Sequence, residues 1–305
     1  MVPARERFRR LQVSEKVGAV MQSQEGESKE SAINGGSIEA EQPVKLSIVV
    51  PMHNEEENVQ PLCREVREAM AGFPHRWELI LVDDASTDQT RSRINEELAQ
   101  DTRIRLVPLG RRRGQSGALC AGFARARGEL IGTVDGDLQN DPRDIPVLAE
   151  ALLKQKVDMV TGWRRKRHDN VVRRISSRVA NWTRNLVTGD KITDVGCSTR
   201  VFRRACLLRV PLFFDGMHRF FPTLFRMSGY TVVEAPVNHR PRLRGRAKYG
   251  VWNRLWRGIR DLFGVRWLKD RFLPEGAAVL ASVARDLPRD PELEDLQNLE
   301  ESSGN

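Results

Sequence analysis

Acidic side chains follow two apolar runs of the 305-residue sequence. Asp83 and Asp84 end the run WELILVDD, and Asp135 and Asp137 end the run ELIGTVDGD with Gly136 between them. Paired carboxylates are hard oxygen ligands of the kind that Mg²⁺ and Mn²⁺ prefer. A divalent ion held there can stabilise the charge of a departing diphosphate. The pattern therefore predicts metal-assisted chemistry on a phosphorylated substrate.

The first acidic pair has a second interpretation. Ser86, Thr87 and Asp88 follow it directly, and all three residue types are common helix caps. A helix start explains Asp88 better than it explains Asp83, because a cap lies just before its helix while Asp83 ends an apolar run. A carboxylate at a strand end is instead well placed to accept hydrogen bonds from a nucleobase or a ribose.

A parallel sheet would bring these two acidic segments together. Apolar, β-branched runs predict strands at 45–50, 77–84, 103–109, 129–137 and 157–163, and helical patterns lie between them at 55–70, 88–99, 117–126 and 142–155. Such alternation predicts an α/β fold with right-handed crossovers, a mostly parallel sheet and helices on both faces. Ligands of such sheets collect at the carboxyl ends of the strands, where the acidic pairs lie.

The ends of the chain differ from this alternating region. We expect a disordered extension at 1–44, a catalytic domain at 45–249, a basic amphipathic helix at 250–272 and an acidic mobile tail at 273–305. The sequence has no signal-peptide pattern and no apolar run of about 18 residues, so we expect neither a leader nor a transmembrane helix. The four cysteines lack metal-binding spacing, which favours reduced thiols in a cytoplasmic protein.

Positive charge is the main feature of the composition. The formal net charge is +9, which indicates an anionic partner: nucleic acid, a phosphorylated substrate or an anionic membrane. Basic residues also border two helical patterns, at 163–187 and 251–263. In the second, one apolar face is predicted to hold Trp252, Leu255, Trp256, Ile259, Leu262 and Phe263. This pattern suits a helix at a membrane interface, and equally a helix packed on its own core.

Four motifs carry a family resemblance: PMHNEEEN (51–58), ILVDDASTDQT (80–90), GQSGALCAGFARARGE (114–129) and DGDLQNDP (135–142). In this order they closely resemble family 2 glycosyltransferases of the GT-A, Rossmann-like fold. The branch is that of dolichyl-phosphate mannose synthases and polyprenyl-phosphate glycosyltransferases, and the resemblance spans about 46–269. It implies inverting transfer of a sugar from a UDP- or GDP-sugar to a polyprenyl or dolichyl phosphate, with Mg²⁺ or Mn²⁺.

The resemblance also implies roles for individual residues. The nucleotide-sugar would contact Pro51, Asn54, Glu55, Asp83, Asp84, Gly117 and Asp135, and the metal would be bound by Asp137 and Gln139. The catalytic group would comprise Asp135, Asp137, Asp194, Arg242 and Lys248. The acceptor phosphate would be bound by Arg164, Arg173, Arg200, Arg242 and Lys248. His53 and Ala247 depart from the family pattern, which often has an aromatic or Leu at the first position and usually Ser at the second.

Two other functions fit the same residues. An enzyme of this fold acting on a saccharide hydroxyl would need a carboxylate base such as Asp194. The other is a non-catalytic nucleotide-sugar binder or a nucleic-acid binder. The intact acidic pairs argue against lost catalysis, and we expect no nucleic-acid partner. We expect the enzyme at the cytoplasmic face of a membrane, attached peripherally. Because similar enzymes often continue into transmembrane helices, a membrane-protein partner is a second means of attachment.

Overall fold

The computed structural model describes residues 43–164, 185, 188–190, 192–194, 196–212, 214–241 and 251–274, although not the side chains of 251–257 and 259. Arg173, Arg242 and Lys248 lie outside the described residues. So do the extension at 1–42, most of the predicted helix at 163–187 and most of the tail. The roles predicted for these parts therefore stay predictions.

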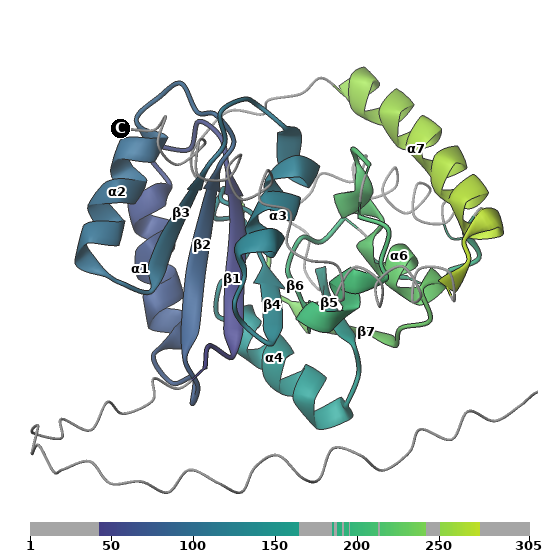
Figure 1. Ribbon diagram of the computed structural model, residues 1–305, viewed down its shortest axis with the longest axis horizontal. Coiled ribbons are helices and arrows are strands. Elements are labelled where there is room, and N and C mark those ends of the chain that lie inside the picture. The colour runs from purple at the N-terminus through teal and green to yellow at the C-terminus, as the bar shows by residue number, and fades with distance from the viewer. Residues whose placement is uncertain are drawn as a thin grey trace, which may run out of the picture. The chain divides into compact units, whose positions relative to one another are not determined.

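Seven strands form one sheet in the order β3-β2-β1-β4-β6-β5-β7 (Figure 1). Their bounds are β1 Leu46–Met52, β2 Trp77–Asp83, β3 Ile104–Pro108, β4 Leu130–Thr133, β5 Met159–Arg164, β6 Arg200–Arg203 and β7 Val232–Val237. β6 runs antiparallel to β4 and β5, and the other pairings are parallel. The predicted mostly parallel sheet and its five strands are confirmed, whereas β6 and β7 were not predicted.

Helices cover both faces of this sheet (Figure 1). They are α1 Val59–Met70, α2 Thr90–Gln100, α3 Gly114–Arg125, α4 Asp144–Gln155, α6 Phe221–Met227 and α7 Val251–Arg271, with 3₁₀ turns η1 Arg204–Leu208 and η2 Met217–Arg219. Leu62 of α1 and Leu148 of α4 pack with Ile48 on one face. Phe123 of α3 and Phe221 of α6 pack on the other face. Alternate residues of β1 thus serve two cores, as expected of a buried parallel strand.

The C-terminal helix α7 has two apolar sides. Leu262 and Val265 are buried in the core that α3 and α6 share, whereas Phe263 is 65% exposed and Trp267 is 64% exposed. The helix was predicted, but placing Leu262 and Phe263 on one common face was wrong. Consecutive residues of an α-helix are rotated by about 100°, so these neighbours cannot both face the core.

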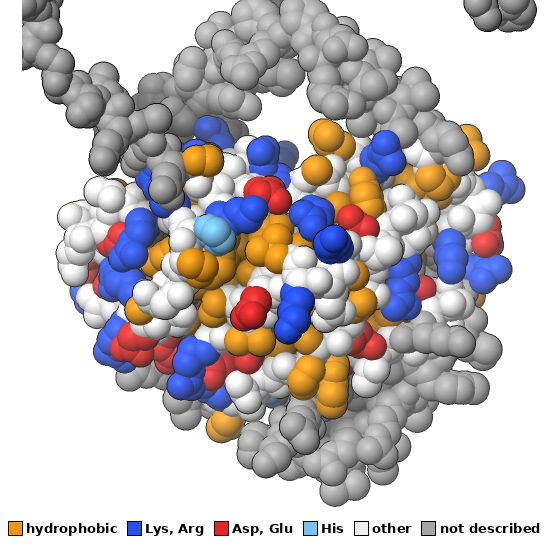
Figure 2. Space-filling view, turned by 90° about the horizontal axis from the view of Figure 1, so that it is seen from below, with side chains coloured by type: hydrophobic (Ala, Val, Ile, Leu, Met, Phe, Trp, Pro, Cys, Tyr) orange, Lys and Arg blue, Asp and Glu red, His pale blue; other side chains and the backbone are white. Residues whose placement is uncertain are grey.

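The described residues include no helix that is both long enough and apolar enough to cross a bilayer. On the face seen in Figure 2, basic and acidic side chains are interspersed around a hydrophobic centre. A nucleic-acid site is instead typically a continuous basic stripe.

Candidate active site

The acidic loop, residues 134–141, begins where β4 ends and contains the first candidate carboxylates. Asp135 accepts hydrogen bonds from Gln115 Nε2 at 2.8 Å and from Ser198 Oγ at 2.7 Å. Burial, together with the nearby charge of Asp137, raises the pKa of Asp135 to about 6. Asp137 is half-buried and accepts the backbone N–H of Gln139 at 3.2 Å. The two carboxylates are thus close enough to repel each other.

The acidic loop rests on the end of β1. A Cβ atom on Gly136 would lie 2.3 Å from Sδ of Met52 and 3.3 Å from the carbonyl oxygen of Pro51. Met52 in turn pairs with Asp83 of β2, and its carbonyl oxygen accepts the N–H of Asp84 at 2.8 Å. The end of β1 therefore separates the two acidic pairs, which lie at one edge of the sheet as predicted.

Both acidic segments contain a strained residue. Ala85 has a φ of 51° and Leu138 a φ of 60°, in the left-handed region that residues with a Cβ atom rarely adopt. Such conformations cost of order 1 kcal/mol or more and are concentrated at functional sites. The strain supports a functional role for these two loops.

Asp83 and Asp84 already hold the surrounding loops in place. Asp83 is buried and accepts Arg91 Nε at 2.8 Å and the N–H of Ser86 at 3.0 Å. Asp84 accepts backbone N–H groups of Arg113 and Gly114, and so fixes the start of α3. These contacts give both carboxylates a structural role, and contact with the nucleotide stays a prediction.

The loops after β1 and β2 are tied together by side chains. Asn54 donates its N–H to Ser86 Oγ at 3.0 Å, and its Oδ1 accepts the N–H of Thr87 at 2.8 Å. The N–H of Glu55 is donated to Thr90 Oγ1. Nδ1 of His53 lies 2.8 Å from the Asp84 carbonyl oxygen. Pro51, the last residue but one of β1, is half-buried.

The helix α2 begins after Gln89, its N-cap residue, which makes no side-chain capping bond, so the suggestion that Ser86, Thr87 or Asp88 is the cap was wrong. Asp88 accepts both the N–H of Thr90, at 3.0 Å, and its hydroxyl, at 2.6 Å. These bonds satisfy polar groups at the beginning of the helix, where intrahelical partners are lacking. Asp88 therefore has a structural role at the start of α2, whereas Asp83 lies at the end of β2.

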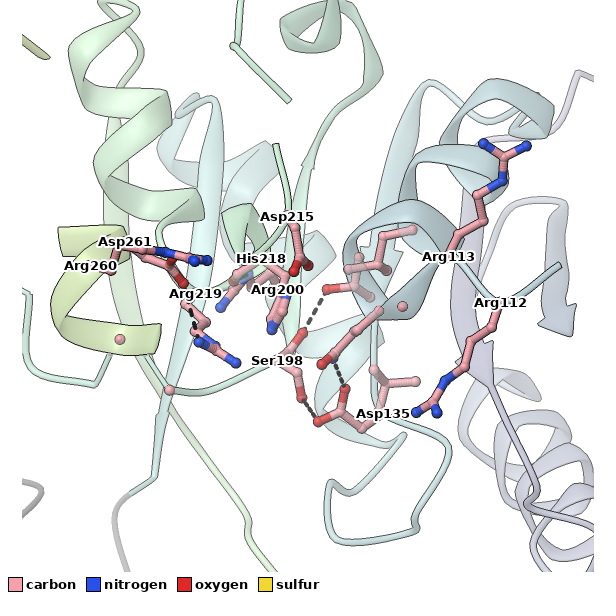
Figure 3. Close-up of a pocket in the computed structure, with 18 residues that line it drawn as sticks. Arg112, Arg113, Asp135, Ser198, Arg200, Asp215, His218, Arg219, Arg260 and Asp261 are labelled. Atoms are coloured by element: carbon pink, nitrogen blue, oxygen red, sulfur yellow. Dashed lines mark hydrogen bonds and ion pairs between the residues drawn. The ribbon is translucent and has the colours of Figure 1, made fainter. Parts of the chain in front are cut away.

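A pocket of about 720 Å³ opens beside Asp135 (Figure 3). Its charged lining residues are Arg112, Arg113, Arg200, Arg219 and Arg260 with Asp135, Asp215 and Asp261. Five arginines against three aspartates leave a formal excess of two positive charges, 5 − 3 = +2. Such a pocket favours an anionic substrate. Gly117 of α3 is not among the lining residues, and its lack of a side chain leaves room for Arg113.

Two residues predicted for different tasks bind each other. Arg164 donates through Nε and one terminal nitrogen to the buried carboxylate of Asp194, at 2.7 and 2.9 Å. This two-bond geometry is the strong form of a carboxylate–guanidinium pair. The pair fixes the end of β5 to the segment before β6. The phosphate binding predicted for Arg164 and the catalytic role predicted for Asp194 would each compete with this ion pair.

Arg200, the remaining described candidate for phosphate binding, is a buried cation in the pocket wall. It donates to the carbonyl oxygens of Cys197 at 2.6 Å and His218 at 2.8 Å, and lies over the ring of Phe221. Burial lowers its pKa to about 10, so it keeps its charge at neutral pH.

Several pocket residues had no predicted role. Gln115 and Ser198 lie within segments that the family resemblance covers, and their hydrogen bonds to Asp135 give each a place in the site. His218 and Arg219 lie in η2, outside any motif that sequence reasoning used. They reach the pocket because η2 packs on α3, a contact between residues about 100 positions apart.

A family model described as "Glycosyl transferase family 2" matches residues 47–210. The chain belongs to glycosyl transferase family 2. The matched range contains both acidic pairs and part of the pocket lining. The predicted family and the predicted enzyme class, a glycosyltransferase, are therefore confirmed. It ends before η2 and α7, the elements that close the pocket on its far side.

Two named relatives show which kinds of glycosyltransferase this chain is similar to. It is 42% identical over 234 residues to a dodecaprenyl-phosphate galacturonate synthase of Rhizobium johnstonii, an alignment covering 75% of this chain and 69% of that one. It is 35% identical over 208 residues to an undecaprenyl-phosphate 4-deoxy-4-formamido-L-arabinose transferase of Edwardsiella ictaluri, covering 68% and 63%. The chain thus matches about two thirds of the length of these relatives.

Solved structures confirm the GT-A fold of this family 2 member. Glucosyl-3-phosphoglycerate synthase of Mycobacterium tuberculosis, in complex with Mn²⁺, UDP and phosphoglyceric acid, superposes with a TM-score of 0.56 at 20% identity. The match covers 74% of this chain and 78% of that one. A second structure of the same enzyme, with Mg²⁺ and UDP, gives a TM-score of 0.56 at 19% identity.

Proposed function

We propose that this glycosyltransferase moves a sugar from a nucleotide-sugar to a polyprenyl phosphate, with inversion at the anomeric carbon. The observation that carries the proposal is the joint position of the two acidic pairs at one sheet edge, beside a basic pocket. Both named relatives are polyprenyl-phosphate enzymes by name, which supports this acceptor.

The donor would lie across the end of β1. Its nucleoside would meet the loops that contain Asn54, Asp83 and Asp84, and its sugar would enter the pocket beside Asp135. The position of Asp135 supports this orientation, because Gln115 and Ser198 hold its carboxylate at the pocket wall. Asp83 already accepts hydrogen bonds from Arg91 and Ser86. A nucleoside would therefore contact other atoms of this loop, or the loop would rearrange when the nucleoside binds.

A divalent ion fits the acidic loop. Asp137 and Gln139 would hold it, and its charge would offset the repulsion between Asp135 and Asp137. Among the described residues no three His, Cys, Asp or Glu side chains form a metal site. A site completed by diphosphate oxygens fits that finding. The ion, Mg²⁺ or Mn²⁺, would offset charge on the leaving nucleoside diphosphate.

The acceptor side needs cations more than it needs a base. A phosphate monoester has a second pKa of about 6 and is already a nucleophile at neutral pH. One of its oxygens would bond to the anomeric carbon as the bond from that carbon to the diphosphate oxygen breaks. The pairing of Asp194 with Arg164 favours this acceptor over a sugar hydroxyl, because a carboxylate so bound is a weak base.

A lipid acceptor requires access to a membrane surface, and α7 provides an apolar face for it. Phe263 and Trp267 are exposed one turn apart, with Arg260 and Arg266 also exposed on the helix. Exposed aromatic residues beside arginines are typical of helices that lie at a bilayer interface. We place the enzyme peripherally at the cytoplasmic face, where nucleotide-sugars are available.

The decisive experiment replaces Asp137 with Asn. With labelled nucleotide-sugar, undecaprenyl phosphate and Mg²⁺ or Mn²⁺, wild type should transfer label into the organic phase. Asp137→Asn should lower kcat by about 100-fold or more, because a metal site contributes several kcal/mol of transition-state stabilisation. Glu150→Gln, which changes an exposed carboxylate on α4, should leave turnover unchanged. Full activity of Asp137→Asn would refute the metal site, and label on soluble saccharides alone would refute the lipid acceptor.

A further inference from the structure

The lining of the pocket contains a histidine with no assigned role. His218 lies in η2, between the Asp135–Ser198 contact and the Arg219–Asp261 ion pair (Figure 3). Its ring and its backbone are both held by hydrogen bonds from other elements. A histidine fixed in this way at a pocket wall presents a defined polar atom to a ligand.

The hydrogen bonds of Ser116 fit one tautomer of the His218 ring. Oγ of Ser116 accepts the N–H of Gly216 at 3.0 Å and lies 2.8 Å from Nδ1 of His218. The Ser116 hydroxyl can donate its own hydrogen to Nδ1, and the neutral ring then has its proton on Nε2. In that tautomer His218 is an Nε2–H donor.

The ring stays neutral across the physiological range. Burial, with the charges of Arg219 and Arg200, lowers the pKa of His218 to about 3. Arg200 also donates to the carbonyl oxygen of His218 at 2.8 Å, which holds the backbone of η2 against the pocket. His218 thus offers a hydrogen-bond donor without a charge, while the nearby arginines supply the charge.

We propose that His218 binds the transferred sugar by donating its Nε2–H to a ring or hydroxyl oxygen. The proposal rests on the function proposed above. Asp135, which accepts hydrogen bonds, lines the same pocket as His218, so a sugar bound there would meet both an acceptor and a donor. A hydroxyl-bearing ring satisfies both groups at once. His218 is accordingly a binding residue for the sugar and takes no proton during transfer.

The test compares a nucleoside diphosphate with its sugar conjugate. Full-length protein with Mg²⁺ is titrated with UDP, UDP-glucose and UDP-galacturonate, and with GDP and GDP-mannose, by calorimetry. Within the nucleotide series that wild type binds, His218→Ala should weaken binding of the sugar conjugate by about three- to tenfold, because one hydrogen bond is lost. Binding of the diphosphate alone should be unchanged. His218→Gln, which keeps an N–H donor at similar reach, should recover most of the affinity.

A second variant tests how the ring is fixed. Ser116→Ala removes the hydroxyl that donates to Nδ1, so the sugar conjugate should lose affinity by a smaller factor while the diphosphate does not. Urea unfolding of each variant verifies that it is folded.

Three results would overturn the proposal. The first is an equal loss of affinity for the diphosphate and the sugar conjugate in His218→Ala, and the second is no loss of affinity for either. The third is an increase in the KM for undecaprenyl phosphate alone, which would assign the contact to the acceptor. If wild type bound none of these nucleotides, the proposed function itself would fail, which is a different outcome from an unselective His218 variant.

Discussion

Adding one methyl group to the acidic loop should dislodge it from the end of β1. In Gly136→Ala the new Cβ would lie 2.3 Å from Met52 Sδ, about 1 Å closer than an ordinary van der Waals contact. The Met52 side chain is buried and cannot swing into solvent, and the Pro51 carbonyl oxygen at 3.3 Å closes the other side. Either the Met52 side chain or the loop must shift, and we expect the loop to move because Met52 is packed in the core.

The structure sets the size of this effect. Overpacking a well-filled core costs about 1–3 kcal/mol, so urea unfolding should show a destabilisation in that range. A displacement of about 1 Å at a reacting group can cost about 100-fold in rate, so kcat/KM should fall far more than stability requires. Gly110→Ala is the matched control, because a Cβ there meets nothing within 4 Å.

A double-mutant cycle makes the reasoning refutable. Met52→Ala alone should cost about 2–5 kcal/mol, because it leaves a cavity. Combined with Gly136→Ala it makes room for the new methyl group, so the double variant should be more stable than the sum of the single effects by about 1–3 kcal/mol. Additive effects, or a Gly136→Ala protein with wild-type turnover, would show that the loop does not depend on this contact.

Two further predictions concern charge and the membrane. Arg103 and Arg67 lower the pKa of Asp101 to about 2, so Asp101→Asn should cost about 1–2 kcal/mol at pH 7 by urea unfolding. Because the folded pKa lies below the unfolded one, this difference should be full above about pH 4 and shrink as pH falls toward 2. Replacing Phe263 and Trp267 together by Ser should weaken sedimentation with phosphatidylglycerol vesicles at least about tenfold, because both side chains would lose apolar burial in the bilayer.

Each of these predictions has a control. The double Ser variant is compared with Val147→Ser, which removes an exposed apolar side chain of α4. Equal vesicle binding by both variants would exclude α7 as the membrane face. A pH-independent cost of Asp101→Asn would mean that the aspartate acts through neutral hydrogen bonds rather than through its charge.

The sequence predicted those parts of the fold that local pattern determines. The strands β1, β2 and β4 are apolar runs, and acidic residues follow β2 and β4, so both their existence and the edge they share could be predicted. β6 could not, because its two apolar residues, Val201 and Phe202, lie between arginines and form a strand only by pairing with β4 and β5. Long-range pairing overrides weak local preference in such segments.

The acidic residues of the candidate site could be predicted from the sequence, but the contacts between its residues could not. Family resemblance gave Asp194 and Arg164 separate tasks, yet they are bonded across 30 positions of sequence. No pattern along the chain states that pairing. His218 is similar, because its place at the pocket depends on Ser116, which is 102 positions away. Contacts between distant segments are set by tertiary packing, which residue spacing does not encode.

The position of β6 between β4 and β5 has a consequence for biosynthesis. A ribosome delivers β5 before β6, yet β5 pairs only with β6 and β7 among the described strands. The nascent chain therefore holds β4 with an unpaired edge until residues 200–203 emerge, and such edges are prone to mispairing. Translation thus completes the acidic loop well before η2 and α7, so the pocket can form only after these later elements have emerged.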